Sequence, residues 1–233
     1  MGAIWLLVGL GVAALLYWMI VIGEGTYLGP WAVRLVYRWG ARHYDTIRSA
    51  THAQDEDRLL PLLRAALAGR SAPQVLDVAT GTGRVPLLLA SDRGFTGSII
   101  GLDLTAQMLD LARQKQAQMC PQAAIHWQQG EASQLAWPDD QFDLVCCLEA
   151  IEYFPRPRQA LAEMVRVLQP GGSLILSKWT DDWARFLPGR ALNEPALRQQ
   201  LHLLGLESIQ ITPWQSGAYE LVRAIKAAHA AVE

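Results

Sequence analysis

The sequence predicts an α/β fold, a doubly wound and mostly parallel sheet with helices on both faces, preceded by a transmembrane helix. Two observations in the body of the chain predict the sheet. Short apolar runs alternate with longer segments of helical periodicity from residue 74 onward, as in strands joined by crossover helices. A glycine turn, at Gly81 and Gly83, follows the first apolar run and leads into a helix. The third observation concerns the start of the chain, where residues 1–23 contain no charged side chain.

Residues 1–23 are predicted to be a membrane anchor. A helix over residues 3–22 would be about 30 Å long, which matches the hydrocarbon core of a bilayer. A cleavable signal peptide is the competing interpretation, but it needs a basic leading region, and no Lys or Arg precedes Arg34. The basic residues follow the apolar run, so the positive-inside rule places the rest of the chain in the cytoplasm. We therefore expect a single-pass protein of the cell membrane.

Residues 24–50 are predicted to be an amphipathic juxtamembrane segment. Two stripes at four-residue spacing run along a helix over residues 27–42. One stripe is basic and the other is aromatic and apolar: Arg34, Arg38 and Arg42, beside Tyr27, Trp31, Leu35 and Trp39. Such a helix either lies along an anionic membrane surface or packs on the folded domain, and the sequence leaves both interpretations open.

Residues 51–233 are predicted to form the folded domain. Apolar stripes that can cover a sheet predict helices at residues 54–67, 106–118, 157–168 and 194–204. Apolar runs predict strands that include residues 75–78, 98–102, 173–177, 208–212 and 219–227, with two more ending before Gly130 and opening at Phe142. The sequence Gln-Pro-Gly-Gly at residues 169–172 is expected to end a helix and turn the chain.

Composition limits the partners of this domain. The formal net charge of −2 argues against general nucleic-acid binding, which needs a basic face. The chain has three cysteines, and the adjacent pair Cys146 and Cys147 lies in an apolar strand. Such a pattern indicates core packing in a reducing compartment rather than a disulfide framework.

The chemistry of the glycine turn favours S-adenosylmethionine as the ligand. A dinucleotide-binding turn needs a third glycine where this chain has Pro86, and the Gly-Lys-Ser/Thr of a phosphate-binding loop does not occur. Asp77 precedes the turn, where its carboxylate would repel a phosphate and attract an ammonium group. S-adenosylmethionine has no phosphate, but it carries an ammonium and a sulfonium.

A second acidic position supports an adenosine-bearing ligand. Asp103 ends the apolar strand that begins near Ile99, about 20 residues past the glycines, where a carboxylate can bind both ribose hydroxyls. With these segments in place, the chain resembles the class I S-adenosylmethionine-dependent methyltransferases, in particular the ubiquinone/menaquinone type. The resemblance covers about residues 41–227 and is carried by residues 75–84, 99–109, 130–143 and 161–172.

The resemblance implies a Rossmann-like sheet of seven strands, the last of them antiparallel, and a set of cofactor contacts. Asp77, Gly81 and Gly83 are expected at the methionine end and the turn, together with Ala79. Asp103 is expected at the ribose, with Leu104 beside it. Glu131 and Ala132 are expected at the adenine edge, where the family usually has an Asp before the Ala, so Glu131 is a departure.

The catalytic candidates are Glu149, Glu152 and Tyr44. Glu149 and Glu152 follow the fourth strand, whose carboxyl end faces the predicted ligand. Several relatives have Glu-His where this chain has Glu152-Tyr153, so a histidine base at that position is impossible here. Tyr44 lies in a Tyr-Asp segment that in the resembled family is near the cofactor, although Asp45 could equally cap a helix.

Several functions of these candidates stay open at this stage. Two carboxylates three residues apart could hold a divalent ion, but capping or solvation of Glu152 is the simpler interpretation, and we predict no metal. His43 is a less favoured candidate base near the entrance. Trp179, Trp183 and Phe186 follow the fifth strand and could line a substrate entrance, contact lipid or pack on themselves.

Two functional hypotheses follow. The first is methyl transfer from S-adenosylmethionine to a lipophilic, membrane-resident acceptor such as a quinone precursor, an isoprenoid or a lipid headgroup. A tether motivates it, because it raises the enzyme concentration near a substrate that stays in the bilayer. The second is a membrane-tethered S-adenosylmethionine-binding domain without turnover that acts as an interaction partner. The acceptor atom, C, O or N, and the oligomeric state are not determined by the sequence.

Overall fold

The computed structural model describes residues 1–52 and 55–228 of the chain. The strands are β1 (Gln74–Val78), β2 (Ser98–Asp103), β3 (Ile125–Gln129), β4 (Phe142–Cys147), β5 (Leu168–Trp179), β6 (Leu206–Trp214) and β7 (Tyr219–Lys226). The α-helices are α1 (Gly2–Tyr17), α2 (Pro30–His52), α3 (Leu60–Ala66), α4 (Arg84–Ser91), α5 (Ala106–Met119), α6 (Pro157–Val167), α7 (Asp181–Ala184) and α8 (Glu194–Leu203). Shorter helical turns are η1 (Trp18–Ile22), η2 (Thr26–Leu28), η3 (Asp55–Leu59), η4 (Ile151–Tyr153) and η5 (Gln215–Gly217).

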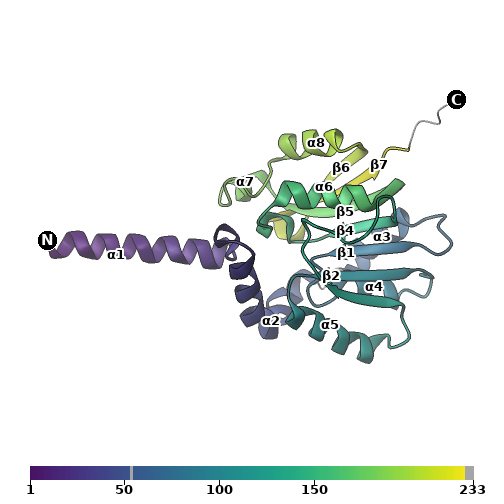
Figure 1. Cartoon of the computed structure of the whole chain (residues 1–233), viewed down its shortest axis with the longest axis horizontal. Coiled ribbons are helices and arrows are strands. Elements are labelled where there is room, and N and C mark those ends of the chain that lie inside the picture. The colour runs from purple at the N-terminus through teal and green to yellow at the C-terminus, as the bar shows by residue number, and fades with distance from the viewer. Residues whose placement is uncertain (53–54, 229–233) are drawn as a thin grey trace.

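The strands form one seven-stranded sheet in the order β3-β2-β1-β4-β5-β7-β6 (Figure 1). Strands β1 to β5 pair in parallel, and β7 runs antiparallel to both β5 and β6. The prediction of a mostly parallel, doubly wound sheet with an antiparallel last strand is therefore confirmed. The strand order reverses between β1 and β4, which creates a crevice at the carboxyl ends of these two strands.

The sheet buries an apolar layer on each face. On one face α6 and α8 pack through Leu161, Met164, Leu197 and Leu201, with α6 giving the stripe predicted from its period. On the other face η3, α3 and α4 pack through Leu59, Leu63, Val85 and Leu89. Adjacent residues of β4 serve the two layers, with Cys146 on the second face and Cys147 on the first. Both of these cysteines are buried and free.

Helix α1 projects away from this body (Figure 1), and none of its residues is buried. Gly2–Ile22 is the stretch of the described chain that is long and apolar enough to cross a membrane, with a mean hydropathy of 2.3. The end of this stretch is fixed to the body, because Trp18 Nε1 donates to the carbonyl oxygen of Phe186 at 3.0 Å and Tyr27 Oη donates to that of Pro188 at 3.0 Å. The segment that follows α1 is thus part of the folded structure.

Helix α2 packs on the body, as one of the two interpretations of the juxtamembrane segment predicts. Its inner face packs on the body, and Val33 and Ala41 are buried there. Its outer face exposes most of the two predicted stripes: Trp31, Leu35 and Trp39 with Arg34, Arg38 and Arg42. The stripe does not include Tyr27 as predicted, because Tyr27 lies before α2 in η2 and is half-buried. The helix runs through residues 50 and 51, between which the sequence analysis places the start of the domain.

Three local expectations need correction. Residues 169–172 are not a turn but lie inside β5, because Leu168 already pairs with Phe142 and the register shifts before Ser173. Asp45 is not a helix cap, since it lies inside α2. The predicted helix over residues 54–67 is η3 followed by α3, and its first residue, Gln54, lies outside the described residues.

Candidate active site

A cavity lies at the carboxyl ends of β1, β2, β3 and β4, over the point where the strand order reverses. Its lining combines the sequence that follows each of these strands with residues of α2 and η4. The predicted site residues that line it are Tyr44, Ala79, Gly81, Asp103, Leu104, Glu131, Ala132 and Glu149. Asp77, Gly83 and Glu152 do not line this cavity. Their positions are described below.

The backbone at the two strand ends beside the crevice is left-handed. Gly81 and Gly83 have φ values of 55° and 89°, which glycine adopts without steric cost. Ala79, after β1, and Glu149, after β4, have φ values of 57° and 54°, which a side chain disfavours. Strained non-glycine residues persist where the surrounding structure fixes them, and they cluster at functional sites. Both of these residues line the cavity.

Asp103 holds the glycine turn against the end of β2. Its Oδ2 accepts from the backbone N–H of Gly81 at 2.9 Å. Its Oδ1 accepts from the backbone N–H of Thr105 at 2.9 Å and from the Thr105 hydroxyl at 2.7 Å. Burial raises the pKa of this carboxyl group, while the hydrogen bonds from Thr105 and Gly81 oppose the rise. The carboxylate therefore joins two of the loops that line the cavity.

Asp77 lies beneath the turn, in a smaller cavity that shares Tyr44, Ala79 and Glu149 with the first one. Its side chain is almost fully buried, and this burial raises its pKa to about 7. A buried carboxyl group of this kind fits a ligand that brings a positive charge, because an ammonium group would favour the ionised form. The residues present thus fit the methionine end of S-adenosylmethionine.

Glu149 is not a free carboxylate. It forms an ion pair with Arg84, and Gln215 Nε2 donates to its Oε1 at 2.6 Å. The same Arg84 binds Asp55 through two hydrogen bonds of 2.7 and 2.6 Å and lies 5.0 Å from the Trp214 ring centroid. The sequence analysis did not identify Arg84 as a functional residue. Its ion pair holds the carboxylate of Glu149, which was predicted as a catalytic base.

Glu152 is buried behind the cavity rather than in its wall. Its Oε1 accepts from the backbone N–H of Trp179 at 2.6 Å, whereas its Oε2 has no hydrogen-bond partner within residues 1–52 and 55–228. Burial raises the pKa of this carboxyl group to about 7. The neighbouring Tyr153 does line the cavity, and its ring packs edge-on against Trp179 at a centroid distance of 6.0 Å.

The predicted adenine end of the cavity is formed by Glu131 and Ala132 after β3. Glu131 Oε1 accepts from the Ser133 hydroxyl at 2.6 Å and pairs with Arg156 at 2.8 Å. These contacts lower the pKa of Glu131, with the Ser133 hydrogen bond as the largest cause. The longer side chain, which departs from the usual Asp, thereby reaches the loop that precedes α6.

Helix α2 covers the glycine turn. A Cβ atom added at Gly81 would lie 3.7 Å from the Tyr44 ring, so Tyr44 sits directly over the turn. Asp45 Oδ1 accepts from the Thr82 hydroxyl at 2.6 Å, and its Oδ2 pairs with Lys115 of α5 at 2.6 Å. These bonds hold α2 over the site, and three further residues of its segment line the cavity: Pro30, Val33 and Tyr37. Sequence reasoning also missed these three residues, although their spacing places Val33, Tyr37 and Tyr44 on one helical face.

The described residues contain no group of three or more His, Cys, Asp and Glu side chains that could hold a metal ion. His43, the less favoured candidate base, is exposed on α2. Trp183 and Phe186 are also exposed and do not line the cavity, whereas Trp179 packs against Tyr153, Trp183 and Tyr219.

Comparison with known proteins agrees with this geometry. Residues 76–176 match the family model described as a methyltransferase domain. This stretch of the chain is therefore similar to methyltransferase domains. The matched residues run from β1 into β5 and include the glycine turn, Asp103, Glu131 and Glu149.

Proteins similar to this chain include curated proteins and solved structures. A demethylmenaquinone methyltransferase of Deinococcus radiodurans is 46% identical over 116 residues, which make up 48% of this chain and 47% of that protein. A ubiquinone/menaquinone biosynthesis C-methyltransferase of Geotalea daltonii is 35% identical over 107 residues, 46% of each chain. The matches therefore span about half the length of these relatives.

The fold of the chain has solved counterparts. The structure of a SAM-dependent methyltransferase from Methanosarcina mazei superposes with a TM-score of 0.59 at 20% identity, covering 72% of this chain and 98% of that one. The predicted fold is confirmed by the sheet order and by this structural match. The family model and the curated relatives support the predicted family, enzyme class and cofactor. The roles of individual site residues stay predictions.

Gly83 is expected to be needed for packing rather than for ligand contact. A Cβ atom there would lie 2.7 Å from the Trp127 ring, at a φ of 89°. Gly83→Ala should therefore lower the free energy of unfolding by about 1–2 kcal/mol through its conformation and by about 1–3 kcal/mol more through overpacking. Gly69→Ala, with a φ of 80° and nothing within 4 Å, isolates the first cost. If urea unfolding gave the same loss of unfolding free energy for Gly83→Ala and Gly69→Ala, the packing role of Gly83 would be contradicted.

The raised pKa of Asp77 predicts that cofactor binding depends on pH. Because a cationic ligand needs the ionised form, affinity for S-adenosylmethionine should rise up to about tenfold per pH unit as pH increases towards 7. Ligand-free stability should change in the opposite sense. A carboxyl group with a raised folded-state pKa stabilises the fold least above that pKa, so the free energy of unfolding should fall between about pH 4 and 7.

Calorimetric titration between pH 5 and 7.5 checks this prediction. Asp77→Asn keeps the side-chain shape but cannot ionise, so its affinity should be weaker and nearly independent of pH over this range. The same pH dependence in wild type and in Asp77→Asn would assign the titration to another group, such as Glu152.

Proposed function

We propose that this protein transfers a methyl group from S-adenosylmethionine to a lipophilic quinone precursor and that α1 anchors it in a membrane, with the domain in the cytoplasm. The cavity is the observation that carries the proposal. One part of it is lined by the predicted cofactor residues, and the rest is lined by the α2 segment, which follows the apolar helix in the chain, and by the loop around η4. The names of the curated relatives favour a quinone precursor over an isoprenoid or a lipid headgroup.

The residues of the site divide the work of such a reaction. S-adenosylmethionine supplies a methyl group on a sulfonium, which is already a good leaving group, so the protein mainly aligns the reactants and excludes water. Asp77 would face the positive end of the cofactor, and Asp103 would bind its ribose. Tyr44, held above the glycine turn by α2, would close the site against solvent.

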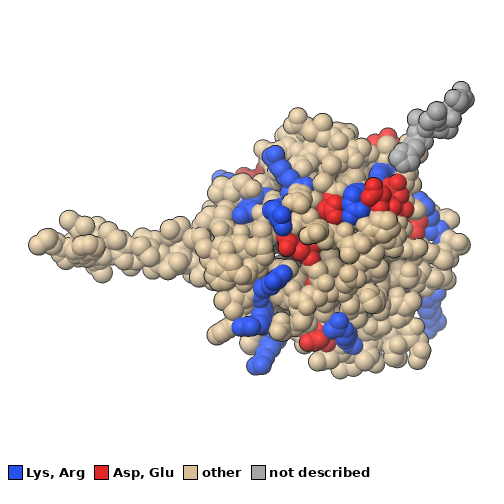
Figure 2. All heavy atoms as spheres, in the orientation of Figure 1, with Lys and Arg blue, Asp and Glu red and all other residues tan. Residues whose placement is uncertain are grey.

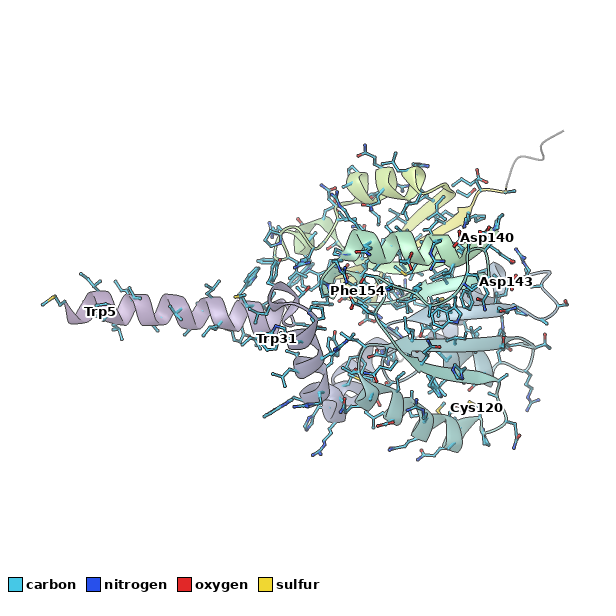
Figure 3. All side chains as sticks on the ribbon, in the orientation of Figure 1. Trp5, Trp31, Cys120, Asp140, Asp143 and Phe154 are labelled. Atoms are coloured by element: carbon cyan, nitrogen blue, oxygen red, sulfur yellow. The ribbon has the colours of Figure 1, made fainter. Side chains whose placement is uncertain are left out.

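An exposed face beside α1 supports the membrane location. We call this face the collar; it consists of Trp31, Leu35, Trp39, Trp183 and Phe186 with Arg34, Arg38 and Arg42. Figure 2 shows Lys and Arg side chains on the body next to the uncharged projecting helix. Figure 3 labels Trp31 and the cavity-lining Phe154 on the side from which α1 projects. Aromatic rings and arginines suit the interface of an anionic membrane.

Transfer of a labelled methyl group into a total lipid extract tests the proposed function. We expect label in an extractable quinone-type product when full-length protein in lipid nanodiscs receives labelled S-adenosylmethionine. Label in water-soluble acceptors alone would refute the lipophilic acceptor. Tight cofactor binding without transfer to any extract would instead favour the non-catalytic alternative, for which the engagement of Glu149 by Arg84 is the supporting observation.

The collar predicts a dependence on anionic lipid. Each arginine near an anionic surface contributes about 1 kcal/mol, so Arg38→Glu with Arg42→Glu should reduce transfer to a vesicle-borne acceptor by roughly tenfold or more. Transfer to the same acceptor in detergent should be unchanged. Arg93→Glu is the control, because Arg93 is exposed in the loop before β2, at the amino ends of the parallel strands and away from the cavity at their carboxyl ends. Equal effects of the two substitutions in vesicles would contradict the collar.

A further inference from the structure

One end of the cavity is not accounted for by the predicted cofactor contacts. It is lined by the α2 segment and by the loop around η4, with Pro30, Val33, Tyr37, Tyr153 and Phe154. This lining is apolar and aromatic apart from two phenol hydroxyls. Such a surface fits a flat apolar ring that offers few polar groups.

A partly buried hydrogen bond connects this end of the cavity to the segment after α1. The Tyr37 hydroxyl donates to Glu24 Oε2. Glu24 has a φ of 47°, so the chain holds a non-glycine residue in a disfavoured conformation at this point. Burial, with the nearby charge of Glu24 as the next cause, raises the pKa of Tyr37 well above its usual value. Glu24 also raises the pKa of Tyr153, after the larger effect of burial.

The direction of this hydrogen bond defines what Tyr37 offers to a ligand. A phenol has one proton and two acceptor lone pairs. Since the proton of Tyr37 is donated to Glu24, its oxygen is left to accept a hydrogen bond from another group. A ligand that occupies this end of the cavity would therefore satisfy Tyr37 with a hydroxyl donor.

The carboxylates that line the cavity form bonds to groups outside its acceptor end. Asp103 accepts from the Gly81 and Thr105 backbones, Glu131 pairs with Arg156, and Glu149 pairs with Arg84. Glu24 does not line the cavity itself, but it accepts from a phenol that does. A proton can therefore reach Glu24 from the acceptor end through one side chain.

We propose that Tyr37 and Glu24 form the proton-accepting end of the acceptor site, which takes an apolar ring bearing a hydroxyl group. This inference rests on the proposed methyl transfer. As the acceptor attacks, its electron pair forms the bond to the methyl carbon, and the pair of the breaking C–S bond stays on sulfur. The acceptor hydroxyl gives its proton to Tyr37 Oη, and the Tyr37 proton passes to Glu24, so charge and protons balance. Tyr37 is the catalytic residue and Glu24 acts through it.

Methyl transfer by Tyr37→Phe and Glu24→Gln tests the inference. Both substitutions keep the shape of the side chain, and each should reduce kcat by roughly 100-fold or more, the usual contribution of a positioned acid or base. The Kd for S-adenosylmethionine should change by less than about twofold. Glu24→Asp should recover part of the loss. An unchanged kcat, or a loss explained by weaker cofactor binding, would overturn the proposal.

A binding measurement on full-length protein separates this inference from the proposed function. The probes are 1-naphthol and naphthalene, titrated in the presence of S-adenosylhomocysteine. Tyr37→Phe should weaken 1-naphthol by about tenfold, the value of one hydrogen bond to a polarised partner, and leave naphthalene unchanged. Equal affinities of 1-naphthol for the wild type and Tyr37→Phe would refute the hydroxyl site even if transfer occurs. Discrimination by Tyr37 without transfer in any extract would support the hydroxyl site and refute the enzymatic function.

Discussion

Replacing Arg84 with methionine is expected to lower the free energy of unfolding by about 3–5 kcal/mol. Arg84 lies at the start of α4 and forms ion pairs with both Asp55 and Glu149. The side chains of these two carboxylates are 11% and 2% exposed, so the substitution leaves two negative charges in a nearly dry site. Breaking a buried ion pair costs more than the pair itself contributes, because the remaining charge keeps its desolvation penalty.

The substitution should also disturb the cavity. Glu149 lines the cavity with a left-handed backbone, and the bond from Arg84 is one of the contacts that fix it. Loss of Arg84 should therefore weaken S-adenosylmethionine binding as well as stability. Urea unfolding and calorimetric titration measure the two effects on one preparation.

Arg113→Met provides a matched control for Arg84→Met. Arg113 pairs with Asp110 on the surface of α5, where the side chains are 49% and 63% exposed. Exposed pairs of this kind contribute about 0–1 kcal/mol. If the free energy of unfolding fell equally in the two variants, the buried ion pairs of Arg84 would not stabilise the fold more than an exposed pair does.

The pairing of Arg84 with Glu149 shows where sequence reasoning stops. The strands, the glycine turn and the order of the helices follow from local patterns, since period and turn chemistry act over a few residues. The number of strands and the antiparallel direction of the last one came from the family resemblance. Glu149 was correctly placed at the cavity by its position after a strand. Its partner comes from another crossover, and no local pattern indicates which side chain will neutralise a buried carboxylate.

Helix α2 gives a second example of this limit. Its exposed stripes contain the conspicuous aromatic and basic residues, whereas the face that covers the cavity uses Val33, Ala41 and Tyr44. The helical periodicity of this segment was visible in the sequence. It did not show which face of the helix packs on the domain, because that depends on contacts with distant parts of the chain. Glu24 could not be found at all, because a single acidic residue after an apolar helix resembles any boundary of a membrane span.

Replacing Asp103 with alanine is expected to weaken S-adenosylmethionine binding by roughly 100-fold or more. The carboxylate already accepts three hydrogen bonds, from the backbone of Gly81 and from the backbone and hydroxyl of Thr105. It is also the group predicted to bind the ribose. Hydrogen bonds to a charged partner contribute about 1.5–3 kcal/mol each, and about 2.8 kcal/mol corresponds to a factor of 100 in Kd.

The loss should be equal for S-adenosylmethionine and S-adenosylhomocysteine, because both carry the same ribose. Asp103→Asn separates ligand contact from loop support, since an amide keeps one acceptor for Gly81 or Thr105 but cannot accept from two ribose hydroxyls as well. Asp103→Asn should have a higher free energy of unfolding than Asp103→Ala. Its affinity for S-adenosylmethionine should be nearly as weak as that of Asp103→Ala. Asp110→Ala, exposed on α5, should leave affinity unchanged. An affinity within about threefold of wild type in Asp103→Ala would remove this carboxylate from the cofactor site.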